Sequence, residues 1–274
     1  MKIAIVTGAS SGMGKEFVMQ IADRFNGIGE IWAIARRQEL MEELSPLVPV
    51  KLRTFSIDLT DESSLRELQE ILEREKPEVK MLINAAGYGK IGTVGSVSLS
   101  DEMGMVDLNC RGLIAVTHMV IPYLSSNSRI IQFSSSASFL PQPGFAIYAA
   151  TKSFVLSYSR ALNEELNHRG IFVTAVCPGP VRTEFFDIAE TTGRIPAYKK
   201  VVMADPKKVV RQALRESMMG RPVSVYGGTM KTLRLAAKVM PHSFILRLFR
   251  AIGVMKVKMK DSNEDYRKDI TCSL

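Results

Sequence analysis

The sequence predicts an α/β protein built on a doubly wound, parallel seven-stranded sheet, with helices on both faces and a C-terminal helical extension. One observation behind this is that short apolar, β-branched runs alternate along the chain with segments of helical periodicity. A second is that turns rich in glycine or polar residues follow these runs, at the strand ends where parallel sheets bind ligands. We therefore expect one domain over residues 1–228 and a basic amphipathic extension over residues 229–274.

Composition places the chain among ordinary globular proteins. Its 274 residues are 46% apolar and 23% charged, which is enough to bury one substantial core. Neither the cysteines nor the histidines show the spacing of a metal site, and an odd number of cysteines argues against a disulfide framework. These residues are Cys110, Cys177 and Cys272, and His118, His168 and His242. We expect no bound metal, no signal peptide, no membrane-spanning segment and a reducing, cytoplasmic location.

The net charge of +8 is concentrated near the C-terminus. Residues 230–260 contain eight lysines and arginines and no acid, which leaves 28 basic and 28 acidic residues in the rest of the chain. A helix in this segment would carry an apolar stripe of Phe244, Ile245, Leu248, Phe249 and Ile252. Its partner could be the cleft, a second subunit or an anionic membrane surface, and all three stay open. Nucleic acid is not an expected partner, because no aromatic residues interleave with the basic ones.

The first strand, over residues 2–7, leads through a glycine-rich turn into a helix over residues 16–25. Bare glycine backbone allows a phosphate to approach closely, while the free amides and dipole of the helix face the anion. The turn lacks the Gly-x4-Gly-Lys-Ser/Thr pattern of triphosphate loops, since Ala9 stands six before Lys15 and Glu16 follows it. Its Gly-x3-Gly-x-Gly spacing also differs from the common dinucleotide fingerprint, and a plain glycine turn is the alternative.

A second strand over residues 30–35 is followed directly by Arg36 and Arg37. In a dinucleotide-binding fold this strand end faces the adenosine ribose, where a carboxylate would bind the 2′-hydroxyl and a cation would accept a 2′-phosphate. Ala35 offers no carboxylate and Arg36 offers a guanidinium, so the pattern favours the phosphorylated cofactor. The alternative is a solvated loop.

The third and fourth strands, over residues 50–57 and 80–83, flank a helix that begins near Asp61 and ends before Pro77. Asp58 stands at the end of the third strand. The small residues Asn84 to Gly87 follow the fourth strand, where they permit close approach of a ligand to the backbone or simply form a turn.

Helical periodicity over residues 100–123 predicts one helix, with Asn109 in its middle. Asparagine is unfavourable there, so its presence suggests a particular role. After a strand over residues 129–133 and three serines comes a helix that ends near Gly170. Its first turns place Tyr148 and Lys152 on one face, four residues apart.

A phenol and an ammonium on one helix face suggest acid–base chemistry. A free tyrosine titrates near pH ~10, so its use as a base at neutral pH requires the pKa to fall by roughly 3 units, and a nearby cation can supply part of that change. Taken alone, such a pair is also an ordinary feature of helices. The remaining predicted elements are strands over residues 171–176 and 222–226, a loop from Thr183 to Ala204, and a helix over residues 205–219.

In this order the motifs resemble those of the short-chain dehydrogenase/reductase family, over about residues 2–228. Asn109, Ser135, Tyr148 and Lys152 are similar to its catalytic tetrad, and Ser135 stands thirteen residues before Tyr148, as in the family. The resemblance implies a Rossmann-like fold that binds a nicotinamide dinucleotide. The implied cofactor-binding residues are Gly8, Ser10, Ser11, Gly12, Met13, Gly14, Arg36, Asp58, Leu59, Asn84, Ala85, Gly87, Tyr148, Lys152, Pro178, Gly179, Val181 and Thr183.

The resemblance also implies reversible hydride transfer between a carbonyl and a secondary alcohol. Tyr148 would donate the proton, Ser135 would hold the carbonyl oxygen, Lys152 would bind the ribose and lower the tyrosine pKa, and Asn109 would anchor a water. We expect NADPH as cofactor, a hydrophobic substrate such as a steroid, bile acid or acyl chain, and a homodimer or homotetramer. A non-catalytic nucleotide-binding regulator and a peripheral membrane protein held by residues 230–260 are the alternatives.

Overall fold

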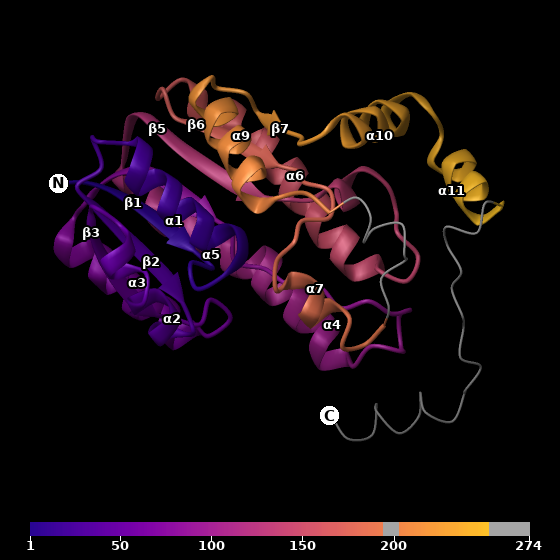
Figure 1. The fold of residues 1–274 in the computed structure, drawn as a ribbon, viewed down its shortest axis with the longest axis horizontal. Coiled ribbons are helices and arrows are strands. Elements are labelled where there is room, and N and C mark those ends of the chain that lie inside the picture. Colours follow the sequence, from indigo (N-terminus) through magenta and orange to yellow (C-terminus); the bar gives the residue numbers. More distant parts are fainter. Residues whose placement is uncertain (194–202, 252–274) are drawn as a thin grey trace.

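The computed structural model describes residues 1–193 and 203–251 (Figure 1). Within these residues seven parallel strands form one sheet in the order β3-β2-β1-β4-β5-β6-β7, which confirms the predicted fold class. The strands are β1 (Lys2–Thr7), β2 (Glu30–Ala35), β3 (Lys51–Ser56), β4 (Glu78–Asn84), β5 (Leu124–Phe133), β6 (Phe172–Val176) and β7 (Val223–Ser224). The strand order reverses direction between β1 and β4, so a crevice opens beside the carboxyl ends of these two strands.

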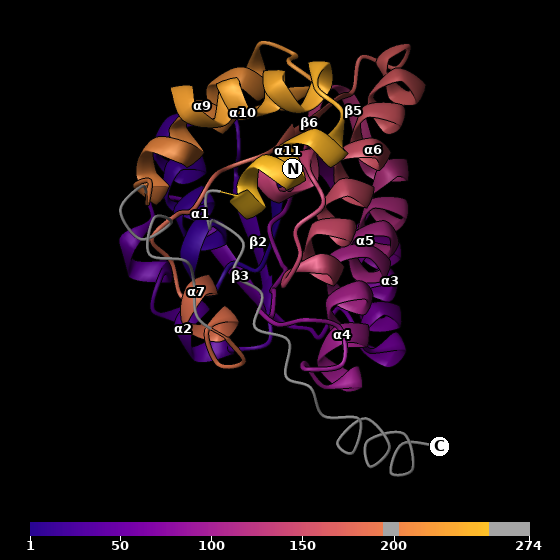
Figure 2. The same cartoon turned by 90° about the vertical axis from the view of Figure 1, so that its right-hand side faces the viewer.

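Helices cover both faces of the sheet, as Figure 2 shows edge-on. Side chains alternate along each strand: Ala4 and Val6 of β1 pack beneath one set of helices, while Ile3 and Ile5 pack beneath the other. The first set is α1 (Gly12–Arg24), α2 (Gln38–Glu42) and α9 (Pro206–Met218), and the second is α3 (Glu62–Glu75), α5 (Leu113–Val120) and α6 (Ala146–Asn167). Strands apolar on both faces are what a sheet buried between two helical layers requires.

The helix predicted over residues 100–123 is not continuous. It consists of α4 (Leu99–Val106), a π-helical turn η2 (Asp107–Gly112), α5, and a 3₁₀ turn η3 (Ile121–Tyr123) that contains Pro122. Asn109 lies in the π-helical turn, where the wider turn lets its buried side chain reach the backbone of Tyr88. The unfavourable asparagine therefore coincides with a break in regular helix geometry.

Other boundaries also differ from the prediction, since α1 begins at Gly12 rather than at residue 16 and β7 is shorter than residues 222–226. β4 and β5 begin earlier than expected, because Val79 pairs with Leu124 before an irregularity in the register. The segment after Thr183, expected as a loop, contains the short helix α7 (Phe185–Ala189). Part of that expected loop, residues 194–202, lies outside the described residues. Short 3₁₀ turns, η1 (Ser45–Leu47) and η4 (Ser136–Phe139), complete this part of the chain.

The described part of the expected C-terminal extension contains the helices α10 (Gly228–Val239) and α11 (His242–Ala251). They project beyond the end of the sheet at the right of Figure 1. Phe244, Ile245 and Leu248 of the expected stripe lie on α11, whereas the side chain of Phe249 and all of Ile252 fall outside the described part. In the described ranges, we find no helix with both the length and the apolar character needed to cross a bilayer.

Candidate active site

A large cleft lies at the carboxyl ends of the central strands and has a volume of about 1690 Å³. A single small-molecule pocket measures about 300–1,000 Å³, so this cleft has room for a dinucleotide and a substrate together. Most of the residues singled out from the sequence line it. They are Gly8, Ser10, Ser11, Gly12, Met13, Gly14, Arg36, Asp58, Leu59, Ala85, Gly87, Ser135, Tyr148, Lys152, Pro178, Gly179, Val181 and Thr183.

The glycine-rich turn between β1 and α1 forms one end of the cleft. A Cβ atom at Gly14 would lie 2.1 Å from the carbonyl oxygen of Gly8, so only glycine allows the turn to close this tightly. Ser11 caps α1 without a side-chain hydrogen bond, and the first turn of α1 contains no acid. The free amides of that turn, with the positive end of the helix dipole, form a site suited to a phosphate.

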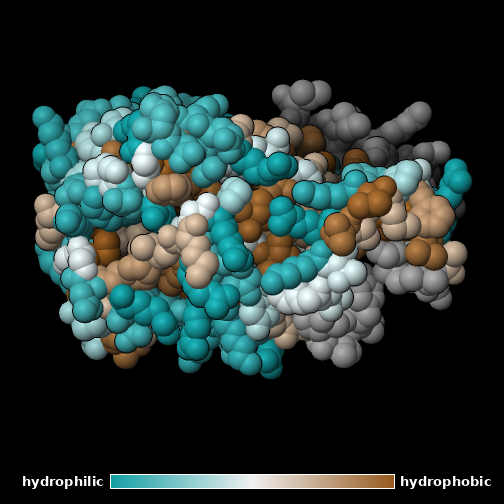
Figure 3. Space-filling view, turned by 90° about the horizontal axis from the view of Figure 1, so that it is seen from above, coloured by the Kyte–Doolittle hydropathy of each residue, from teal (hydrophilic) through white to brown (hydrophobic). Residues whose placement is uncertain are grey.

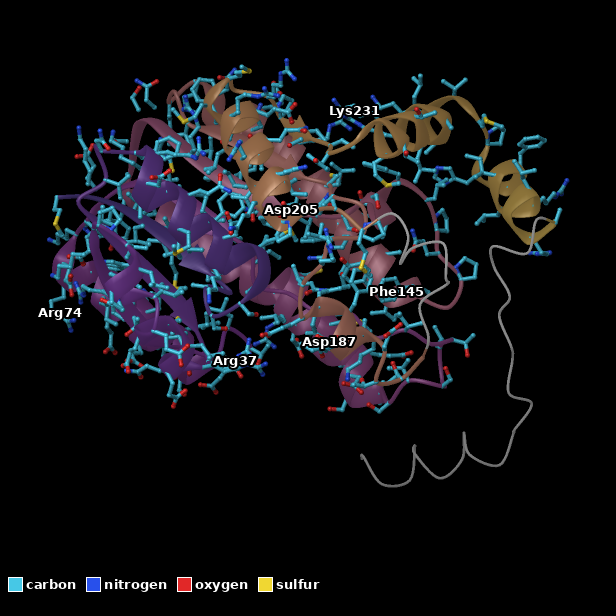
Figure 4. The ribbon with its side chains drawn as sticks, in the orientation of Figure 1. Arg37, Arg74, Phe145, Asp187, Asp205 and Lys231 are labelled. Carbon is cyan, nitrogen blue, oxygen red and sulfur yellow. The ribbon has the colours of Figure 1, made fainter. Side chains whose placement is uncertain are left out.

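Two arginines stand at the end of β2, beside this turn. The side chain of Arg36 is 74% exposed and lies 3.8 Å from a carboxylate oxygen of Asp58. Arg37, which is labelled in Figure 4, was not among the predicted site residues. Its Nη2 donates to Ser10 Oγ at 3.3 Å and to Glu184 Oε2 at 2.9 Å. The hydrogen bond from Arg37 lowers the pKa of Glu184. The pair of arginines after β2 was the sequence feature that could have identified Arg37 as a site residue. That its side chain reaches Glu184 on the other side of the cleft is visible only in the fold.

Tyr148 lies in the first turn of α6, buried among aromatic rings. Phe145 stacks on it with ring centroids 4.3 Å apart, and Phe185 of α7 packs at 5.3 Å. Burial raises the pKa of Tyr148 to about 12, while a hydrogen bond with Ser135 acts in the opposite direction. At neutral pH the phenol therefore keeps its proton. Neither phenylalanine was predicted as a site residue, because no local motif marks them.

Lys152 is buried one turn further along α6. Its Nζ donates to the carbonyl oxygen of Phe133 at 2.9 Å and lies 5.6 Å from the ring centroid of Tyr148. Ser134 Oγ donates to the Lys152 carbonyl oxygen at 2.8 Å, which ties the end of β5 to the helix. Burial lowers the pKa of Lys152 to about 8. From the sequence, this lysine is expected to lower the tyrosine pKa; in this structure burial raises the pKa of Tyr148, and the hydrogen bond with Ser135 acts against burial.

Asn109 lies behind the cleft lining rather than in it. Its Nδ2 donates to the Tyr88 carbonyl oxygen at 2.9 Å and to Thr151 Oγ1 at 3.1 Å, and its Oδ1 accepts from the Tyr88 amide at 3.0 Å. A Cβ atom at Gly87 would lie 2.7 Å from Asn109 Oδ1 and 3.1 Å from Lys152 Nζ. The four residues expected as the catalytic tetrad therefore lie close together. The backbone of Gly87, which has no side chain, lies between Asn109 and Lys152.

Asn84 also lies beneath the cleft. Its Nδ2 donates to Thr117 Oγ1 at 2.9 Å and to Gln132 Oε1 at 3.0 Å, so it links β4 to α5 and β5. Cys177, at the end of β6, is fully buried, and burial raises the pKa of its thiol to about 11. Within residues 1–193 and 203–251, histidine, cysteine and carboxylate side chains form no group of three that could hold a metal.

Comparisons with known proteins agree with this arrangement. The sequence model described as short chain dehydrogenase matches residues 2–192. Sulfoacetaldehyde reductase 2 of Chromohalobacter salexigens is 33% identical over 192 residues, which cover 67% of this chain and 74% of that protein. The closed form of serine dehydrogenase complexed with NADP+ superposes with a TM-score of 0.72 at 26% identity, covering 82% of this chain and 94% of that one.

A third comparison shows only a shared fold. The short chain dehydrogenase/reductase of Burkholderia phymatum in complex with NAD gives a TM-score of 0.74 at 19% identity, and covers 90% of this chain and 95% of that chain.

Proposed function

The chain belongs to the short-chain dehydrogenase family of oxidoreductases, and from this premise we propose that it interconverts a ketone and a secondary alcohol with NADP(H). The single observation that carries the proposal is the meeting of Ser135, Tyr148 and Lys152 in one cleft, with Asn109 directly behind them. Asn109, Tyr148 and Lys152 are buried and Ser135 is partly buried. A prepositioned hydroxyl pair in such a site stabilises charge that develops on a carbonyl oxygen far better than water does.

The residues around the cleft fit a nicotinamide dinucleotide. The amides after Gly12 would hold the phosphates, Asp58 and Leu59 would face the adenine, and Pro178 to Thr183 would hold the nicotinamide end. When bound, the cofactor supplies or accepts the hydride. Lys152 stands beside the phenol, where its ammonium would also reach a ribose hydroxyl.

The protonation states favour reduction. A phenol whose pKa is about 12 is protonated at neutral pH, so Tyr148 is ready to donate a proton to the oxygen of a ketone. Ser135, which forms a hydrogen bond with the phenol, would hold that oxygen. In the reverse direction the phenol must first lose its proton, and its burial opposes that step.

Arg36 supports a preference for NADPH over NADH. It is largely exposed, its ion-pair partner in the described part of the chain is Asp58 at 3.8 Å, and it follows Ala35, which has no carboxylate to receive a 2′-hydroxyl. A guanidinium in this position binds a 2′-phosphate as a bidentate partner.

The substrate side of the cleft supports a hydrophobic carbonyl compound, such as a steroid, bile acid or acyl chain. Leu140, Phe145, Phe185, Met230 and Leu233 line this side. A regulator that keeps the cofactor without turnover is the second candidate, and the complete set of Asn109, Ser135, Tyr148 and Lys152 speaks against it.

Exposed apolar side chains on adjacent helices support the proposed homodimer or homotetramer. Met103 of α4, Ile114 of α5 and Phe154 of α6 are all exposed, and Phe154 stacks on Tyr158. We also propose a reducing, cytoplasmic setting, which suits the free thiols of Cys110 and Cys177.

The test is a panel of ketones and alcohols, including steroids, with NADPH or NADH, followed by the absorbance of the reduced nicotinamide. We expect turnover of apolar ketones with NADPH. Tight cofactor binding without turnover of any compound would favour the regulator instead.

A further inference from the structure

Helix α10 turns one of its faces toward the cleft. Thr229, Met230 and Leu233 line the cleft, and Met230 lies against Gly179. Met230 and Ala237 also pack against a buried cluster at the end of β6. The helix therefore forms part of the wall of the proposed substrate site.

The opposite face of α10 points away from the body. Leu235 is 63% exposed and Val239 is 75% exposed, and the exposed Lys231 and Lys238 lie beside them. At 3.6 residues per turn these four side chains fall on one side of the helix, opposite Met230 and the other cleft residues. An apolar stripe next to cations is the pattern of a helix that lies in a membrane interface.

Helix α11 exposes the same kinds of side chain. Phe244 and Leu248 are large, exposed apolar residues, and Arg247 and Arg250 are exposed beside them. Residues 228–251 hold five lysines and arginines and no acid. In Figure 3 brown and teal residues lie next to one another at the right, where these helices project.

We propose that the outward faces of α10 and α11 bind an anionic lipid surface and hold the cleft beside it, so that a lipophilic carbonyl or alcohol substrate enters from the bilayer. The substrate part of this inference rests on the proposed function; the docking part does not. A second copy of the same surface is a poor occupant, because its four exposed cations, Lys231, Lys238, Arg247 and Arg250, would face the same four without a compensating acid. An anionic bilayer complements the charges and offers acyl chains to the exposed side chains.

Co-sedimentation of the full chain with vesicles tests the docking. We expect binding to vesicles of phosphatidylserine and phosphatidylcholine at low ionic strength, little binding to phosphatidylcholine alone, and release as added salt shortens the screening length. Lys231→Gln combined with Lys238→Gln should weaken binding roughly 10- to 30-fold. Leu235→Gln combined with Val239→Gln should weaken it as well, since these changes remove the inserted apolar groups.

The matched control is Arg66→Gln combined with Arg74→Gln on α3, which removes the same charge from the other end of the molecule. Figure 4 shows Arg74 far from Lys231 on α10. We expect this control to bind vesicles nearly as well as the unmodified protein. The docking surface would be overturned if the Arg66/Arg74 control lost as much vesicle binding as the Lys231/Lys238 variant. It would also be overturned if the unmodified protein did not sediment with anionic vesicles.

Activity separates this inference from the proposed function. A small water-soluble ketone should be reduced equally by the unmodified protein and by both α10 pairs, because none of the four altered residues lines the cleft. A ketone dissolved in anionic vesicles should be reduced more slowly by the α10 pairs, in proportion to their weaker binding. If the chain binds vesicles but reduces no ketone at all, the docking surface stands and the proposed reaction falls. If the α10 substitutions change the reduction rates of the soluble and the vesicle-borne ketone by the same factor, the proposed entry of substrate from the bilayer is wrong.

Discussion

One wall of the cleft consists mostly of backbone and small side chains, whereas the other consists of large aromatic and apolar side chains. The cofactor wall comprises Gly8 and residues 10–14, 35–37, 58–60 and 85–87. The aromatic wall comprises residues 140–145 with Tyr148, Phe185, Phe186, Ile188, Thr229, Met230 and Leu233. The first wall is built from turns that directly follow strands, so its shape depends on local backbone geometry. The second depends on helices far apart in the chain that meet around Tyr148. Substitutions in the cofactor wall and in the aromatic wall should therefore have different effects on cofactor binding and on turnover.

The largest effect should come from Tyr148→Phe, which alters chemistry in the aromatic wall and leaves the cofactor wall intact. We expect kcat to fall by about 10²- to 10⁴-fold, because the proton donor is lost. The dissociation constant for NADPH should stay nearly unchanged, since the ring still packs between Phe145 and Phe185. Steady-state kinetics and fluorescence titration of the cofactor measure the two quantities. Retention of more than about a tenth of kcat would rule out Tyr148 as the acid.

Lys152, between the two walls, should make stability depend on pH. Its pKa in the folded protein is about 8, whereas in the unfolded chain a lysine keeps its proton to about pH 10.4. Between these values the unfolded state binds more protons, so the free energy of unfolding should rise with pH from 8 to 10, by up to about 3 kcal/mol. Denaturant unfolding at several pH values should show this rise in the unmodified protein and its loss in Lys152→Met. If the free energy of unfolding changed with pH in the same way in both proteins, burial would not destabilise the Lys152 ammonium.

Gly14→Ala should break the cofactor wall without touching the chemistry. A Cβ there would lie 2.1 Å from the Gly8 carbonyl oxygen, so the turn must open. We expect NADPH binding to weaken by about 10- to 100-fold, the equivalent of the about 1–3 kcal/mol that overpacking costs. Gly27→Ala is the matched control, because nothing lies within 4 Å of a Cβ at that glycine. Calorimetric titration of both variants tests the prediction, which fails if they bind NADPH equally well.

The smallest effect should come from Arg36→Ala, which removes one charge from the edge of the cofactor wall. The KM for NADPH should rise by about 10-fold, the loss of roughly 1.4 kcal/mol expected for a charge-assisted hydrogen bond, while the KM for NADH stays the same. Arg66→Ala, an exposed arginine on α3, controls for the change in net charge. Equal efficiency with both cofactors in the unmodified protein would show that Arg36 is an ordinary solvated residue.

The same contrast explains what could be predicted from the sequence. Gly8, Gly12 and Gly14 stand in one short segment, and Tyr148 and Lys152 are four residues apart, so spacing alone indicated their proximity. The strands were predicted because burial on both faces leaves uninterrupted apolar runs.

Other features depend on contacts between distant segments. Phe185 and Met230 reach the cleft from helices whose positions no local pattern fixes. The bonds from Arg37 to Ser10 and Glu184 join residues from three separate turns. The burial that raises the pKa of Tyr148 also had no local signal, since it arises only when α6, α7 and the Tyr88 segment pack together.

The two outer strands have a consequence for how copies of this protein behave at high concentration. An edge strand presents unpaired amides and carbonyls that can add a strand from another molecule and so start aggregation. At one edge β7 has only two residues, Val223 and Ser224, which leaves very few such groups. At the other edge β3 carries Lys51 and Arg53, which form ion pairs with Glu30 and Glu75. An approaching strand would have to displace these charged side chains. The short β7 at one edge and the charged side chains of β3 at the other thus oppose the addition of a strand from another molecule.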